Sequence, residues 1–166
     1  MPRPANKAPL RDLTTYRRSH AVRLPDDDYA GDANIHVTIC AGNGRPFCDA
    51  PTAKLVRDSV EFCSRKLGYT LHGYCLMPDH LHVLLSPGDS GVALGKWLQD
   101  FKSYTTNQYR RTKGATRLWQ ESAHDRVCRD DEAPEKVLAY IVNNPVRAGL
   151  VERWQDWPAT KVFIAL

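Results

Sequence analysis

The sequence lacks closely spaced cysteines and long apolar runs. Its 166 residues include five cysteines, an odd number with no C-x-x-C pair, which argues against both a disulfide framework and a cysteine zinc site. No run approaches the roughly 20 apolar residues of a membrane-spanning helix, and no basic-then-apolar leader is evident. We therefore expect a cytoplasmic protein with reduced thiols and no membrane association. A hydrophobic content of 42% is enough for one domain with a proper core.

Acidic residues are scarce in one part of the chain. Residues 96–129 contain three of them against eight lysines and arginines, although the whole chain has a formal net charge of only +4. A basic segment of this kind favours a polyanionic partner, and nucleic acid is the first candidate. The alternative is a solvated helix face, which is the usual explanation of a charged run.

The apolar pattern predicts one folded domain over residues 33–158, flanked by a flexible arm over 1–32 and a tail over 159–166. Alternating apolar residues predict four strands, at 33–40, 69–77, 80–86 and 126–129. A helical period predicts three helices, at 50–67, 91–111 and 132–143, the last stopped by Pro145. This order predicts an α+β fold, the ferredoxin-like split β-α-β sandwich, with an antiparallel sheet and helices on one face.

Two histidines, His80 and His82, lie two residues apart in an apolar run that follows a Pro78-Asp79 turn. Because side chains alternate along a strand, both imidazoles point to one face while Leu81 points to the other. Imidazole is the commonest protein ligand for divalent metals, so the pair indicates part of a metal site. A half-buried strand that happens to carry two histidines is the alternative.

Tyr140 and Asn144 lie four residues apart, one turn from each other on the last predicted helix. An amide oxygen can complete the coordination of a metal, and a phenol can attack phosphorus. The pair therefore fits a metal-assisted phosphoryl transfer. A tyrosine packed at a helix end and an asparagine that caps the helix before Pro145 would explain the same residues.

Taken together, these motifs resemble the HUH single-tyrosine transposases, and among them the REP-associated tyrosine transposases. The resemblance covers roughly residues 33–158 and rests on five segments in order: Pro78-Asp79-His80-Leu81-His82, Phe101-Lys102-Ser103, Leu118-Trp119-Gln120, Asp125-Arg126-Val127 and the stretch from Tyr140 to Val151. It implies a ferredoxin-like fold, a divalent metal (Mg²⁺ or Mn²⁺) and single-stranded, hairpin-forming DNA as substrate.

Residue by residue, the resemblance assigns Tyr140 as the catalytic nucleophile and His80, His82 and Asn144 as metal ligands. It implies attack of the tyrosine on a DNA phosphodiester, which leaves a 5′-phosphotyrosine link and a free 3′-hydroxyl. Because the adduct keeps the bond energy, rejoining is possible, as transposition and DNA recombination require. The resemblance favours a monomer over a dimer and a nucleoid-associated location.

Basic and aromatic side chains are the candidates for DNA contact: Lys102, Arg110, Arg111, Trp119, Arg126, Arg129 and Arg147. Trp119 would stack on an unpaired base, although a core tryptophan explains it equally well. Two other tyrosines are weaker candidates for the nucleophile, since we expect Tyr104 in the core and Tyr109 beside two arginines. Three further histidines are expected to be structural: His36, His72 and His124. A place beside the metal ligands or facing DNA is the alternative for His36.

Two other functions stay open at this point. The first is a binding module that keeps the fold and the basic face, recognises DNA hairpins and has lost cleavage. The second is a metal hydrolase in which a bound water attacks, so that turnover proceeds without a covalent intermediate.

Overall fold

The computed structural model describes residues 32–114, 117–128 and 132–166. The predicted arm therefore lies outside the described residues except for its last residue, and Arg129 lies outside them too. The described elements follow in this order: β1 (Ile35–Cys40), a 3-10 helix (Pro46–Cys48), α1 (Ala50–Lys66), β2 (Thr70–Leu76), β3 (His80–Ser86), α2 (Leu94–Lys113), β4 (His124–Val127), α3 (Pro134–Val142), α4 (Asn144–Arg147), a second 3-10 helix (Trp154–Asp156) and β5 (Thr160–Val162).

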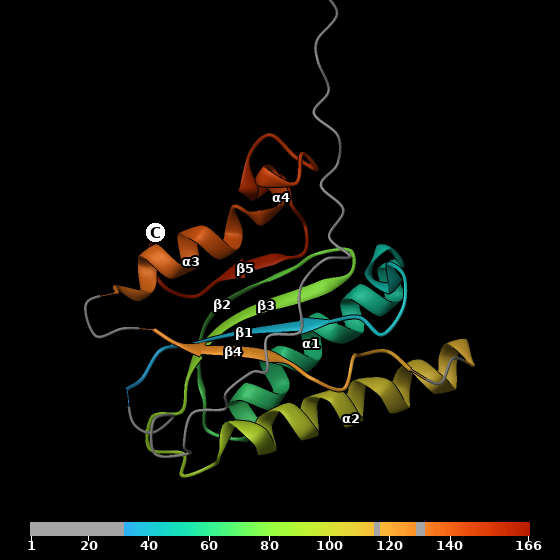
Figure 1. Cartoon of the computed structure of the whole chain (residues 1–166), viewed down its shortest axis with the longest axis horizontal. Helices are drawn as coiled ribbons and strands as arrows, with labels where there is room; N and C mark the ends of the chain where they lie inside the picture. Colours follow the sequence, from blue (N-terminus) through green and yellow to red (C-terminus); the bar gives the residue numbers. More distant parts are fainter. Residues whose placement is uncertain (1–31, 115–116, 129–131) are drawn as a thin grey trace, which may run out of the picture.

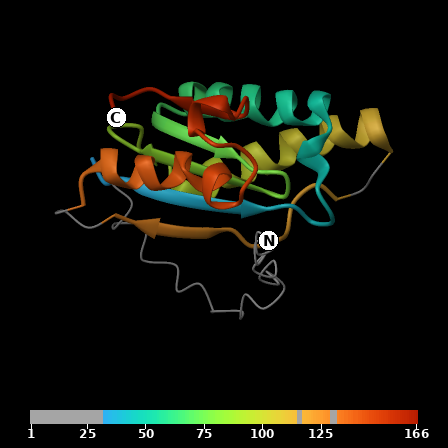
Figure 2. The same ribbon diagram turned by 90° about the horizontal axis from the view of Figure 1, so that it is seen from above.

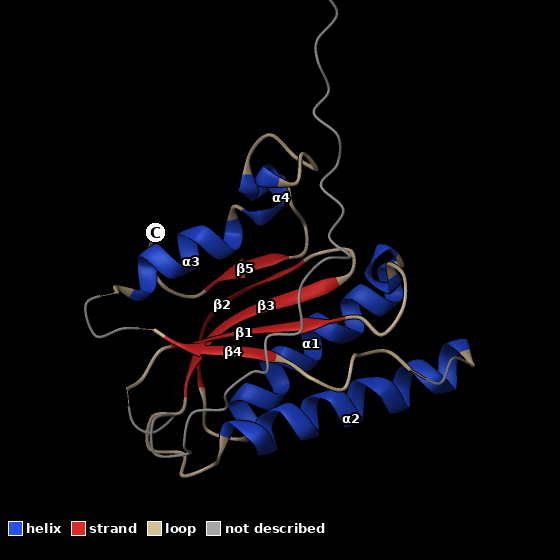
Figure 3. Ribbon diagram, in the orientation of Figure 1, coloured by secondary structure: helices blue, strands red, loops and turns tan. Residues whose placement is uncertain are grey.

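The five strands form one antiparallel sheet with the order β4-β1-β3-β2-β5 (Figures 1 and 3). The first four strands, with α1 between β1 and β2 and α2 between β3 and β4, have the topology of the split β-α-β unit. The predicted ferredoxin-like α+β fold is therefore confirmed. β5 extends the sheet beyond β2, and its three residues are too few to produce a periodic pattern in the sequence.

α1 and α2 cover one face of the sheet. Ile35, Val37 and Ile39 of β1 point to this face and are completely buried with the apolar sides of both helices. Asp49 is the N-cap of α1, and its carboxylate accepts a hydrogen bond from the Thr52 backbone N–H at 3.1 Å, the usual N-cap contact. This layer holds the larger of the two apolar cores.

α3 packs on the opposite face of the sheet. Its residues Val137, Leu138 and Ile141 form a second buried cluster with Cys75 of β2 and Leu84 of β3. Figures 1 and 2 show that α3 runs in the same direction as β1. Among the described residues, the cover of this second face comes from α3, with Trp154, Trp157 and Ile164 packed against the same cluster.

Gly73 allows the close approach of α3 to the sheet. A Cβ atom at this position would lie 2.7 Å from Leu138 Cδ1 and 2.9 Å from the Lys161 carbonyl oxygen. We expect Gly73→Ala to lower the free energy of unfolding by about 1–3 kcal/mol, because the added methyl group overpacks the core. Urea denaturation measures this change. Gly95→Ala in α2 is the matched control, because its Cβ would meet nothing within 4 Å. Equal stability of the two variants would contradict this packing.

Several boundaries differ from those of the predicted elements: β1 begins at Ile35, α2 begins at Leu94 and α3 spans Pro134–Val142. The predicted strand at 126–129 is β4, which begins two residues earlier because His124 and Asp125 also pair with β1. α2 continues to Lys113, where Gly114 adopts a left-handed conformation with φ of 66° and ends the helix. α4 follows α3 directly and was not predicted. Of the helices in the described ranges, none is long and apolar enough to cross a membrane.

Candidate metal and tyrosine site

The two histidines of β3 converge on one point. The Nε2 atoms of His80 and His82 are 3.1 Å apart, and the two rings are nearly perpendicular, with an interplanar angle of 89°. The neighbours Leu81 and Val83 are completely buried on the α1 and α2 side, as the alternation predicts. The pair therefore presents two imidazole nitrogens together on the other face of the sheet.

Asp79 orients the first imidazole. Its Oδ1 atom lies 2.6 Å from His80 Nδ1, and this contact is the main cause that lowers the pKa of the Asp79 carboxyl. An ionised carboxylate can only accept a hydrogen bond, so the Nδ1–H group of His80 donates to Asp79, and Nε2 is the nitrogen that remains for a metal. Asp79 thus prepares His80 Nε2 to bind a cation.

Thr38 and His36 of β1 hold the second imidazole. His82 Nδ1 lies 3.0 Å from Thr38 Oγ1 and 3.1 Å from His36 Nε2. Burial, and to a smaller extent the charges of neighbouring histidines, lowers the pKa of His82 to about 3. Burial, followed by the charge of Arg126, lowers the pKa of His36 to about 4. Both rings are therefore neutral at physiological pH, the form in which histidine binds metals.

The separation of the Nε2 atoms fits a single divalent cation. Two nitrogen ligands with metal bonds of about 2.1 Å and a near-right angle between them lie about 3.0 Å apart, close to the observed 3.1 Å. In the described part of the chain, no group of three or more His, Cys, Asp or Glu side chains is arranged to hold a metal ion. As far as the described residues go, further ligands of a metal here would be of another kind, such as amide, phosphate or water oxygens.

Tyr140 lies on α3, on the histidine side of the sheet. The helix packs on Leu84, which follows His82 by two residues and so points to the same face. Because α3 runs parallel to β1, its C-terminal end lies toward the end of the sheet where Cys40 pairs with His80 (Figure 1). The Tyr140 side chain is 51% exposed, so its hydroxyl is accessible to a substrate.

Asn144 lies one turn after Tyr140, although α3 itself ends at Val142 and Asn144 begins α4. Its Nδ2 group donates to the carbonyl oxygens of Tyr140 and Ile141 at 3.1 and 3.0 Å. These bonds satisfy carbonyls at the end of α3, as the capping alternative required. They also direct the amide nitrogen toward the helix, which leaves the amide oxygen for a cation, so the ligand role stays a prediction.

Two guanidinium groups lie near Tyr140. The central carbon of the Arg147 guanidinium is 4.8 Å from the centre of the phenol ring, in the range of a cation–π contact. Arg126 interacts electrostatically with both Tyr140 and His36, and His36 contacts His82. Arg126 pairs with His36 in the β1–β4 register and so lies on the same face of the sheet as the histidine pair.

Trp119 belongs to the core and cannot stack on a base. It is 4% exposed, its indole N–H donates to Thr105 Oγ1 at 2.8 Å, and its ring packs against Phe47 and Phe101. The prediction of a DNA contact at this residue is wrong because the surrounding rings exclude any ligand.

Lys102 holds a loop in place. Its ammonium group donates to the carbonyl oxygens of three consecutive residues at 2.9, 3.0 and 3.2 Å, those of Gln120, Glu121 and Ser122. A DNA contact would have to compete with these bonds, so the structure favours a structural role. Arg110 and Arg111 are exposed near the end of α2, and their DNA contacts stay predictions, as does that of Arg147.

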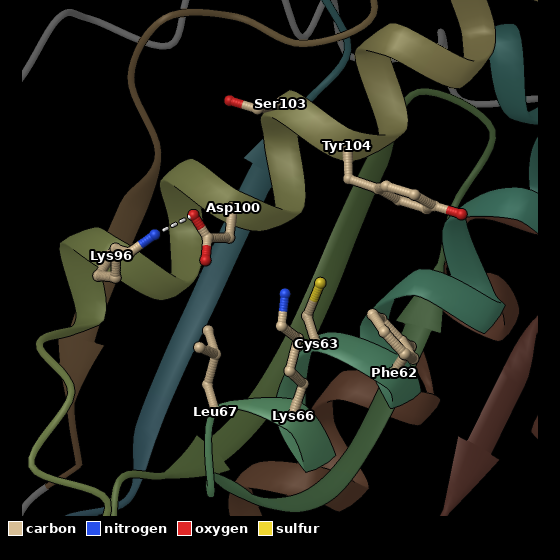
Figure 4. A pocket seen from close by; sticks show the side chains of 8 residues that line it. All are labelled: Phe62, Cys63, Lys66, Leu67, Lys96, Asp100, Ser103 and Tyr104. Carbon is tan, nitrogen blue, oxygen red and sulfur yellow. Dashed lines mark hydrogen bonds and ion pairs between the residues drawn. The ribbon is translucent and has the colours of Figure 1, made fainter.

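The two alternative tyrosines differ from expectation: Tyr104, expected in the core, is exposed, and Tyr109, expected beside two arginines, packs on the edge of the core. The buried face of α2 includes Phe101 and Thr105, so Tyr104 lies one position outside it and is 46% exposed, whereas Tyr109 packs on the edge of the core. Tyr104 lines a cavity of about 350 Å³ between α1 and α2 (Figure 4). That cavity opens on the helical layer, across the sheet from the histidines, and is not part of the site.

Asp79→Asn is expected to weaken metal binding by about 10- to 100-fold, the usual effect of losing a carboxylate that orients a histidine ligand. Isothermal titration with Mn²⁺ measures the change. Asp89→Asn, at an exposed residue of the loop before α2, is the matched control and should bind like the wild type. Unchanged affinity in Asp79→Asn would show that this carboxylate does not prepare His80 for a metal.

Comparison with known proteins identifies the relatives of this fold and site. The model of the family described as "Transposase IS200 like" matches residues 30–144. A REP-associated tyrosine transposase of Escherichia coli strain K12 is 23% identical over 107 residues, which are 63% of this chain and 61% of that protein. A Haemophilus influenzae protein of the same description is 29% identical over 94 residues, 51% of this chain and 53% of that protein. This chain thus matches little more than half the length of these relatives.

A solved structure has the same fold. It is a REP-associated tyrosine transposase bound to a REP hairpin, and it superposes with a TM-score of 0.66 at 20% identity over 80% of this chain and 78% of that one.

Proposed function

Because this chain belongs to the IS200-like transposase family, we propose that it cleaves and rejoins single-stranded DNA with Tyr140 as the nucleophile and a divalent metal at His80 and His82. One observation carries the proposal: the paired Nε2 atoms, 3.1 Å apart, and the accessible tyrosine of α3 share one face of the sheet. The active form that we propose is a monomer.

The proposed reaction exchanges one phosphoester for another. The Tyr140 phenol oxygen bonds to the phosphorus and its proton leaves to solvent, while the bond from phosphorus to the 3′ oxygen breaks. The 3′ oxygen keeps the electron pair and takes up a proton, so the products are a 5′-phosphotyrosine and a free 3′-hydroxyl. Attack of that hydroxyl on the adduct restores the strand.

The remaining side chains of the site prepare the reactants. Asp79 and Thr38 orient the two imidazoles, and Asn144 would add its amide oxygen to the metal. A bound Mg²⁺ or Mn²⁺ ion supplies polarisation of the scissile phosphate and neutralises the charge that develops on its oxygens. Arg147, next to the phenol ring, would contact a phosphate near the point of attack.

We propose a DNA hairpin with a single-stranded flank as the substrate. The structural neighbour with the same fold is bound to a REP hairpin, and the exposed guanidinium groups of Arg110, Arg111 and Arg147 suit contacts with phosphate groups. Such contacts give an affinity that falls steeply with salt. Transposition or a related rearrangement of DNA is the process that this chemistry serves.

A covalent-adduct assay tests the proposal. Wild-type protein is incubated with end-labelled hairpins that carry single-stranded flanks, in Mg²⁺, Mn²⁺ or EDTA, and the products are separated on a denaturing gel. We expect a protein–DNA band that EDTA abolishes. Cleavage without a covalent band would favour a metal hydrolase, and binding with neither cleavage nor adduct would favour a DNA-binding module.

A further inference from the structure

Arg126 and Glu132 form a two-pronged ion pair beside the site. The Nη1 and Nη2 groups of Arg126 donate to the two carboxylate oxygens of Glu132 at 2.6 and 3.1 Å. Arg126 lies on the edge strand β4, directly opposite His36 of β1. Paired residues of neighbouring strands point to the same face of a sheet, so the guanidinium group lies on the histidine side.

The charge of Arg126 acts on both halves of the site. It lowers the pKa of His36, whose ring is 3.1 Å from the His82 ring nitrogen. It also interacts with Tyr140 of α3. Arg126 is opposite His36 in the β1–β4 register, and His36 contacts His82, so the guanidinium group lies on the face where a phosphate at the histidine pair would bind.

The ion pair fixes the guanidinium group without using all of its donors. A guanidinium has five N–H groups, and the contact with Glu132 uses two of them, which leaves three for other oxygens. The hydrogen bonds to Glu132 raise the pKa of Arg126 further above its ordinary value, so the group stays charged. A guanidinium group that is held in place, stays charged and keeps unused N–H donors is suited to bind phosphate oxygens.

We propose that Arg126 binds a non-bridging oxygen of the scissile phosphate while Tyr140 attacks, and that Glu132 is the positioning residue that holds the guanidinium group there. This inference rests on the proposed tyrosine reaction and adds to it a cation supplied by the protein. The ion pair also connects β4 with the segment before α3, and a purely structural role would leave the reaction rate at saturating DNA unchanged.

Single-turnover cleavage at saturating hairpin DNA tests the proposal. We expect Arg126→Ala to slow adduct formation by about 100-fold, the typical effect of removing one donor to a developing anion, with a much smaller change in DNA affinity. Added guanidinium ion should restore part of the rate of this variant, which a lost structural contact would not allow. Arg126→Lys keeps the positive charge but lacks the planar pair of N–H donors, so it should give an intermediate rate.

Glu132→Gln tests the positioning role. It should slow the reaction by about tenfold, and adding it to Arg126→Ala should cause little further loss, because residues that act together are not additive. The pair of Arg153 and Asp156 is also two-pronged, through Nε and Nη2 at 3.0 and 2.7 Å, so Arg153→Ala is the matched control and should react like the wild type.

The outcomes separate the two proposals. If the wild-type protein forms no adduct with any hairpin, the tyrosine reaction is wrong and the role of Arg126 falls with it. If the wild type reacts but folded Arg126→Ala reacts at the same rate, or slows without any rescue by guanidinium, the role of Arg126 alone is overturned. Thermal unfolding of each variant identifies those that have lost the fold, and Arg126→Lys then provides the comparison.

Discussion

Tyr140→Phe is expected to remove the covalent protein–DNA adduct, with a loss of more than about a thousandfold in rate, because the nucleophilic oxygen is absent. Hairpin binding should stay within about twofold of the wild type. The side chain is 51% exposed on the surface of α3, and a substitution at such a position changes stability by no more than about 0.5 kcal/mol. A denaturing gel measures the adduct, and fluorescence anisotropy measures the affinity.

Tyr104→Phe is the matched control for this experiment. Tyr104 is 46% exposed, so both substitutions remove one hydroxyl from an accessible tyrosine, but Tyr104 lies between α1 and α2 on the other side of the sheet. It should form the adduct at the wild-type rate. An adduct that persists in Tyr140→Phe would assign the nucleophile to another side chain.

His80→Ala is expected to abolish tight binding of Mg²⁺ and Mn²⁺ and to slow adduct formation by more than about 100-fold, since the polarisation that a metal supplies amounts to several kcal/mol. His80 tests the metal site better than His82. The His80 side chain is 23% exposed at the start of β3, whereas His82 is 8% exposed and contacts Thr38 and His36, so its removal also disturbs the core.

Isothermal titration with Mn²⁺ separates the loss of metal from the loss of activity. His72→Gln serves as the control, because His72 contacts Ser86 at 2.7 Å, at the opposite end of β3, and a glutamine can keep that hydrogen bond. Its metal affinity should equal that of the wild type. Equal affinities of His80→Ala and wild-type protein would exclude the histidine pair as the metal site.

The parts of the site that lie within one element were predictable from the sequence. Alternation along a strand was enough to put His80 and His82 on the same face, and helical spacing was enough to bring Asn144 close to Tyr140. Side chains on one face of a strand recur every two residues, and those on one face of a helix recur every three to four. Both spacings can be read directly from residue numbers. The same is true of α1 and β3, whose predicted and observed boundaries differ by at most one residue.

The contacts between elements were not predictable in this way. His36 contacts His82 from 46 residues away, and only the register of β1 against β3 reveals it. The sequence therefore favours a structural role for His36 over a place beside the metal ligands, although it allows both. The same limit applies to Trp119, because an aromatic residue in a basic segment suits a DNA contact until the packing of Phe47 and Phe101 around it is known.

Mapping the adduct by mass spectrometry tests the central claim most directly. The wild-type adduct is digested with nuclease and trypsin, and the nucleotide that remains attached is located by fragmentation. The tryptic peptide of residues 137–147 contains a single tyrosine, Tyr140. We predict a 5′-linked nucleotide on this residue in samples with Mg²⁺ or Mn²⁺ and none in EDTA. A nucleotide on any other side chain, or cleaved hairpin DNA with no modified peptide, would contradict the account.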